Sequence, residues 1–212
     1  LYVGNPEKRL FWGYLLSSLA IVCAAMIMKG ATVTAALKRI LVPNLWFNRS
    51  SLVDLQWIWL NYFLRAALVI PILGGQVSFA LWVNKQLYSN FGQGDFLQAS
   101  VITTGVVFTC CLFLLEDFSR FIVHYSYHKV AFLWRFHAIH HSASTLTPLT
   151  LYRIHSFEMI INSCRSLFII GGVSGIFIYM FDGAIERIDI YGASIFSFLF
   201  NIAGSNLRHS PF

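Results

Sequence analysis

Long apolar stretches separated by few charged residues dominate this sequence. Five of them are candidates for crossing a bilayer, which takes about 20 helical residues: Leu10–Met28, Leu55–Leu73, Leu97–Leu115, Met159–Phe181 and the shorter Ile188–Ala203. Only 11% of the 212 residues are charged, whereas soluble domains carry about 25%. We therefore expect one all-α integral membrane domain over residues 1–212, with about four to five transmembrane helices.

The second apolar stretch ends near residues that often interrupt helices. Pro71 and the pair Gly74–Gly75 lie close to its end. The next segment, Val77–Tyr88, is amphipathic and too short to span a bilayer. We expect it to lie at the membrane interface, with Trp82 among its interfacial aromatic residues.

The net charge of +6 is spread through the segments between the apolar stretches. This distribution is typical of membrane topology and not of a face that binds nucleic acid phosphates. Basic segments alternate with neutral or acidic ones. The positive-inside rule then places the N-terminus outside, and Lys29–Asp54, Glu116–Glu158 and the residues from Arg208 onward in the cytoplasm.

All seven histidines lie in the second half of the chain, and five fall within the 18 residues from His124 to His141. His124 and His128 are spaced i, i+4, and His137, His140 and His141 are spaced i, i+3, i+4, so each group shares one helix face. Imidazole nitrogens suit iron, zinc or copper, and five donors exceed the four of a tetrahedral zinc site. The spacing predicts two metal ions, or one ion of higher coordination number, in a cytoplasmic helical segment.

The expected topology brings two further histidines to the same side of the membrane. His155 directly precedes the fourth apolar stretch, and His209 follows the fifth. The fourth and fifth stretches would form a hairpin that leaves the cytoplasmic face and returns to it. All seven histidines are therefore predicted on one side.

Four elements of this region resemble those of a known family. Asp117–His128 has the spacing Asp-Phe-x-x-Phe-x-x-His-x-x-x-His, and Leu133–Ser142 contains a His-x-x-His-His box preceded by Leu-Trp. Arg153–Glu158 is an Arg-x-His-x-x-Glu element, and Asn206–Ser210 contains a further histidine. In this order the elements resemble the fatty acid hydroxylase/sterol desaturase superfamily, over a histidine-box segment 116–158 and a late element 205–210.

The resemblance implies a non-haem pair of iron ions that uses O2 and two electrons to hydroxylate or desaturate a lipid C–H bond. Sterols, fatty acyl chains and related lipids are candidate substrates. The predicted metal ligands are His124, His128, His137, His140, His141, His155 and His209.

Asp117 and Glu158 are candidates to accept a hydrogen bond from the outer ring nitrogen of a metal-bound histidine. The alternative is that each lies at a helix end and pairs with Arg120 or Arg153.

The electrons are expected to come from a separate protein. The sequence has no Gly-x-Gly-x-x-Gly element, and its four cysteines lack the spacing of an iron–sulfur site. A cytochrome b5, a ferredoxin or a rubredoxin-like protein would serve as donor. The basic cytoplasmic segments would attract an acidic donor surface.

Two departures from the family pattern leave alternatives open. The family usually has a final His-x-x-His-His box after the element at His209, so we expect the natural chain to continue beyond Phe212. Phe121 and Tyr125 stand where the family often has tyrosine and arginine. A protein without the last box would be a non-catalytic structural subunit with partners in a membrane complex. A haem-binding subunit is a further alternative, whereas the absence of His-Glu-x-x-His disfavours zinc hydrolysis.

Overall fold

The computed structural model describes residues 2–94, 99–181, 189–190 and 193–204. Within these residues the chain is all-α, as predicted, apart from one short antiparallel pair, β1 (Asp189–Ile190) and β2 (Ala193–Ser194). The helices are, in chain order, η1 (Tyr2–Gly4), α1 (Trp12–Met28), α2 (Val33–Ile40), α3 (Pro43–Trp46), α4 (Arg49–Phe91), α5 (Val101–Lys129), α6 (Ala131–His141), η2 (Pro148–Tyr152), α7 (Ser156–Met180) and α8 (Ile195–Ile202).

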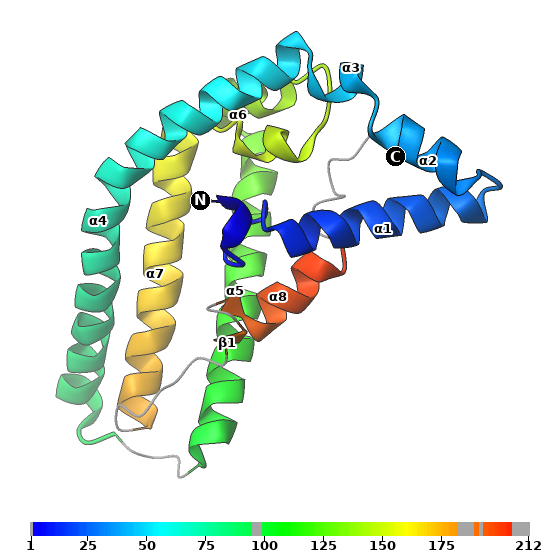
Figure 1. The fold of residues 1–212 in the computed structure, drawn as a ribbon. Coiled ribbons are helices and arrows are strands. Elements are labelled where there is room, and N and C mark those ends of the chain that lie inside the picture. The colour runs from blue at the N-terminus through cyan, green and yellow to red at the C-terminus, as the bar shows by residue number, and fades with distance from the viewer. Residues whose placement is uncertain (1, 95–98, 182–188, 191–192, 205–212) are drawn as a thin grey trace.

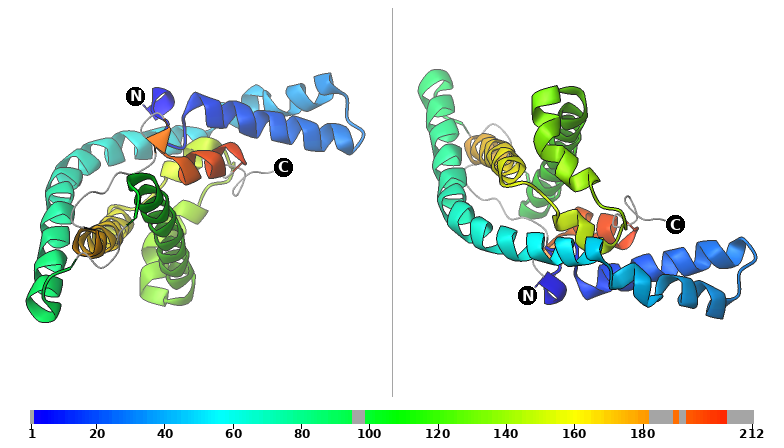
Figure 2. Two further views of the ribbon diagram at one scale, coloured as in Figure 1. Left: turned by 90° about the horizontal axis from the view of Figure 1, so that it is seen from below. Right: turned by 90° about the horizontal axis from the view of Figure 1, so that it is seen from above.

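Three long helices form the body that carries the histidines. α5 and α7 run in opposite directions, and α7 lies between α4 and α5 and packs against both (Figure 1). α4 curves around the outer side of α7, as the views along the helices show (Figure 2). The end of α5, the short helix α6 and the start of α7 therefore meet at one end of this body.

α5 and α7 match the third and fourth predicted spans. Among the described residues they are the two helices long and apolar enough to cross a membrane. Large apolar side chains of α5, such as Ile102 and Leu114, are exposed, which suits a surface covered by lipid. Between the two helices Phe108, Val173 and Phe177 form a buried cluster.

The second predicted span and the interfacial segment after it are one helix, α4. Asn48 starts it by accepting a hydrogen bond from a backbone N–H of the first turn, and Gly92 ends it with a φ of 79°. Pro71 lies inside the helix. Gly75 serves helix packing, because a Cβ atom there would lie 2.8 Å from Cδ1 of Leu167 in α7. The prediction of two separate segments was therefore wrong.

α4 and α7 approach each other closely at two further glycines. A Cβ on Gly171 would lie 2.9 Å from the backbone oxygen of Gln76, and one on Gly175 would lie 2.5 Å from that of Ala80. Small residues four positions apart are a common contact between membrane helices. α4 consequently follows α7 along its apolar length.

The first and fifth predicted spans differ most from the structure. α1 is a 17-residue apolar helix that runs across the direction of α5 and α7 and packs on α2 and α8 (Figure 1). α8 has eight residues, or about 12 Å at 1.5 Å per residue, against a hydrocarbon layer of about 30 Å. The strand pair takes up residues that the fifth span was expected to include. Tyr14 of α1 is buried against Phe198 of α8, with ring centroids 5.6 Å apart.

Candidate metal centre

Four histidine side chains converge where α5 and α6 meet. His124, His128, His137 and His141 each offer a ring nitrogen, and these atoms all lie within 4.8 Å of one another. The Nε2 atoms of His141 and His137 are 3.1 Å apart, and those of His128 and His124 are 3.3 Å apart. Imidazole nitrogens grouped in this way form a donor set for a transition-metal ion.

The turn between α5 and α6 produces this convergence. Val130 is both the last flanking residue of α5 and the first of α6, with an extended backbone (φ −100°, ψ 113°). The helix direction changes at this one residue, so α6 packs back on the end of α5. Each helix carries two of the four histidines one turn apart on a single face. The turn makes these two faces meet.

A carboxylate from α7 holds His137. The Nδ1 atom of His137 donates a hydrogen bond to Oε2 of Glu158 at 3.1 Å. Both side chains are buried, and His137 exposes only 1% of its surface. With the proton on Nδ1, the Nε2 atom keeps its lone pair and faces His141. Metal-binding histidines are commonly fixed in tautomer and orientation by such a partner.

Two further side chains, Tyr127 of α5 and Asn162 of α7, lie on the α7 side of the centre. The buried ring of Tyr127 stacks on His137, with centroids 5.0 Å apart and an interplanar angle of 23°. Its hydroxyl lies 3.4 Å from the backbone oxygen of Glu158, which also accepts a hydrogen bond from Asn162 at 3.0 Å. Sequence reasoning missed both residues. Each lies about one helical turn from a predicted site residue, His124 or Glu158, and this spacing was the available signal.

The remaining predicted histidines lie in different surroundings. The ring centroid of His140 is 5.5 Å from that of His137 and 5.3 Å from that of His141. His155 starts α7, where its Nδ1 accepts a hydrogen bond from the backbone N–H of Phe157 at 3.0 Å. One of its ring nitrogens therefore caps a helix. His209 lies outside the described residues.

The two predicted carboxylates differ in their partners. Glu158 is buried against His137. Asp117 is partly exposed on α5, and its carboxylate lies 3.8 Å from the guanidinium of Arg120. Pairing with an arginine was the alternative expected for Asp117, and a role for it beside a metal-bound histidine stays a prediction.

A buried polar network joins α4 to the segment between α6 and α7. Nε of Arg153 donates to Oδ1 of Asp54 at 2.7 Å, and the Thr150 hydroxyl donates to Oδ2 at 3.0 Å. All three side chains are buried. Sequence reasoning treated Arg153 as an alternative partner of Glu158 and Asp54 only as a charge. The signal for Asp54 was a lone carboxylate in a basic segment.

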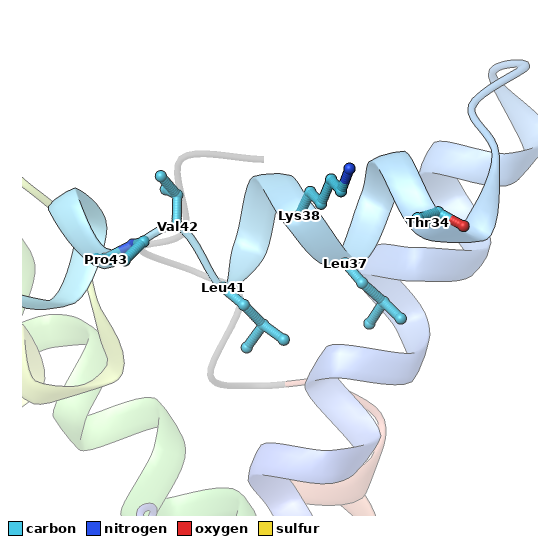
Figure 3. A pocket seen from close by; sticks show the side chains of 6 residues that line it. All are labelled: Thr34, Leu37, Lys38, Leu41, Val42 and Pro43. Atoms are coloured by element: carbon cyan, nitrogen blue, oxygen red, sulfur yellow. The ribbon is translucent and has the colours of Figure 1, made fainter.

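One open hollow, of about 420 Å³, lies on α2 and the turn that follows it (Figure 3). Leu37 and Leu41 point to the same side of α2, and Lys38 points away from them. The lining residues are Thr34, Leu37, Lys38, Leu41, Val42 and Pro43. None of these residues is a predicted site residue. The histidine cluster, and not this hollow, is therefore the candidate site.

The donor set fits an iron centre. Neutral imidazole binds iron as well as zinc and copper, and the contact between His137 and Glu158 is one that ligand histidines usually make. The four converging nitrogens are enough donors for one ion. A second ion needs more donors, for which the candidates are His140, beside the set, and the predicted ligands His155 and His209.

Comparison with protein families agrees with this arrangement. The family model described as fatty acid hydroxylase matches residues 109–210. No curated protein and no solved structure matches the chain. The matched range covers most of α5 and all of α6 and α7, and it contains all seven histidines. This match over just under half of the chain agrees with the resemblance to the fatty acid hydroxylase/sterol desaturase superfamily that the histidine boxes indicate.

Proposed function

We propose that the protein is a membrane-bound oxygenase that uses two iron ions and O2 to hydroxylate or desaturate a lipid C–H bond. The lipid is a sterol, a fatty acyl chain or a related molecule. The observation that carries the proposal is the set of four histidines, with His137 held by Glu158, inside the segment that matches the fatty acid hydroxylase family.

The chain's side chains take distinct roles in this proposal. The four converging histidines supply nitrogen ligands, and His140, His155 and His209 are proposed as further donors. Glu158 keeps the proton of His137 on Nδ1, so that Nε2 remains a ligand atom. When bound, the iron ions would supply the activation of O2 and the removal of hydrogen from the lipid.

The centre has a closed side and an open side. His137, Tyr127 and Glu158 are buried and exclude water from the α7 side. His128 and His141 are exposed, which leaves a side from which lipid and O2 would approach. A site with this asymmetry suits a substrate that arrives from the membrane.

The reaction needs an electron donor. Hydroxylation consumes the C–H bond, O2, two electrons and two protons, and it yields an alcohol and water. Desaturation removes two hydrogens from neighbouring carbons with the same O2, electrons and protons, and yields two waters. A cytochrome b5, ferredoxin or rubredoxin-like partner is proposed as donor. The exposed cations Lys129, at the end of α5, and Arg135, within α6, would favour an acidic donor surface.

We also propose that the chain crosses the membrane more than twice, with the histidines on the cytoplasmic side. Close packing along α7 supports α4 as a membrane helix beside α5 and α7. An impermeant thiol reagent tests the sidedness through a cysteine introduced at exposed Ser144. Labelling is expected only after right-side-out vesicles are opened, and labelling of sealed vesicles would contradict this topology.

Lipid analysis tests the proposed activity. Full-length protein in lipid vesicles would be supplied with a reduced electron donor and O2, and lipids would be compared by mass spectrometry with those from the His137→Ala variant. We expect the wild-type protein, and not the variant, to give a product that is heavier than the substrate by one oxygen or lighter by two hydrogens. Identical lipids with several donors and lipid classes would contradict the proposal.

A further inference from the structure

A buried ion pair links the two halves of the chain close to the histidines. Asp54 of α4 and Arg153 are 99 residues apart, and Asp54 lies outside the family-matched range. Asp54 is completely buried, and its two carboxylate oxygens accept hydrogen bonds from Arg153 and Thr150. A buried ion pair is tolerated when such bonds satisfy it.

Arg153 also reaches the end of the histidine helix. Its NH2 group donates to the backbone oxygen and the hydroxyl of Ser50 in α4, at 2.7 and 2.9 Å. Its NH1 group donates at 3.2 Å to the hydroxyl of Ser142, the residue that follows His141 and flanks the end of α6. One side chain thus joins α4 to the end of α6.

The same face of α4 also binds the residues that immediately precede α7. The side-chain amide of Asn61 donates to the backbone oxygens of Tyr152 and Ile154, both at 3.0 Å. These residues lead directly to His155 and, one turn later, to Glu158. We use the term α4 clamp for the contacts of Ser50, Asp54 and Asn61 with Thr150, Tyr152, Arg153 and Ile154, together with the bond from Arg153 to Ser142.

We infer that Asp54 is a positioning residue of the metal centre. Through Arg153 it holds the segment 142–155, which connects the converging histidines of α6, His137 and His141, to the carboxylate of Glu158. A shift of this segment would separate Glu158 from His137 or turn α6 away from α5. This inference rests on the proposed function for the statement that the histidines bind metal. The placement of the segment 142–155 rests on the α4 clamp alone.

The test uses full-length protein in lipid nanodiscs. Asp54→Asn removes the charge and nearly keeps the shape. Glu116→Gln is the matched control, because Glu116 pairs with Arg165 at 2.9 Å between α5 and α7, away from the clamp. Hydrogen exchange of metal-free protein reports on the segment 142–155, and optical titration with Co²⁺ reports on metal affinity.

We expect Asp54→Asn to lose amide protection across the segment 142–155 and to bind Co²⁺ about tenfold more weakly, the lower end of the effects seen for outer partners of metal ligands. Glu116→Gln should change neither quantity. Unchanged protection and affinity in Asp54→Asn would overturn the inference.

A double variant separates positioning from general stability. Replacing both partners of a buried ion pair by apolar residues often restores stability, so Asp54→Leu/Arg153→Met should regain thermal stability while its Co²⁺ affinity stays low. Recovery of affinity together with stability would overturn the positioning role. Wild-type protein that binds no metal would contradict the proposed function, whereas hydrogen exchange would still decide whether the clamp holds the segment.

Discussion

The two ends of α7 are held by different kinds of contact. At its start, Glu158 accepts a hydrogen bond from His137, and the α4 clamp fixes the residues just before it. Further along, Gly171 and Gly175 pack against the backbone of α4. Hydrogen bonds fix the direction in which a ring nitrogen points, whereas glycine contacts fix how closely two helices approach. Substitutions at the start should therefore affect mainly metal binding, and those further along mainly stability.

The largest effect is expected from His137→Ala. His137 has the most buried ring of the four and contacts both Glu158 and His141. Its loss removes a ligand and the bond that orients it, so we expect tightly bound metal to disappear. Elemental analysis of purified full-length protein measures this, with circular dichroism as a check of folding. Wild-type metal content in a folded variant would contradict the assignment.

Glu158→Gln should weaken metal binding without removing it. The amide can still accept the bond from His137 but lacks the charge that makes the histidine a stronger ligand. We expect affinity to fall about 10–100-fold, measured by competition with a chelator. Asp117→Asn is the control, because Asp117 is partly exposed and lies beside Arg120. An equal loss in both variants would show that Asp117 also acts on a metal-bound histidine.

Gly175→Ala tests the other end of α7. The new methyl carbon would lie 2.5 Å from the backbone oxygen of Ala80, so the helices must move apart. We expect a loss of about 1–3 kcal/mol in the free energy of unfolding, the usual cost of overpacking. Gly172→Ala is the matched control, because its nearest neighbour would be an atom of Phe79 at 3.8 Å. Similar stability of both variants in a detergent unfolding assay would argue against the close contact.

The smallest effect on stability is expected at the start of α7, where His155 caps the helix in addition to its proposed role as a metal donor. His155→Ala removes the acceptor for the backbone N–H of Phe157 and should cost about 1 kcal/mol of stability. Asparagine is a good capping residue, so His155→Asn should regain most of it. Equal thermal stability of the alanine variant and the wild-type protein would contradict the capping role.

Local sequence patterns predicted the histidine faces and two of the long helices. The i, i+4 spacing of His124 and His128 fixes a shared face once the segment is helical. The apolar stretches of α5 and α7 are long enough to be identified without knowledge of their neighbours. Pro71 and Gly75 misled the prediction for α4, because Gly75 serves a contact with Leu167 of another helix.

Contacts between distant segments could not be predicted from local patterns. Asp117 follows the third apolar stretch and Glu158 precedes the fourth, so their sequence positions give no reason to prefer one of them. Of the two, only Glu158 is buried beside a histidine. The pairing of Asp54 with Arg153 joins positions 99 residues apart. No periodicity indicates such a pair. The tertiary fold, and not helix propensity, decides which carboxylates support the centre.

Iron content and Mössbauer spectroscopy of full-length protein in detergent test the central claim most directly. We predict two non-haem iron ions per chain, bound through histidine, and their loss in the double variant His137→Ala/His140→Ala. A folded full-length protein without iron, whose double variant also folds normally, would contradict the oxygenase and favour a non-catalytic subunit of a membrane complex.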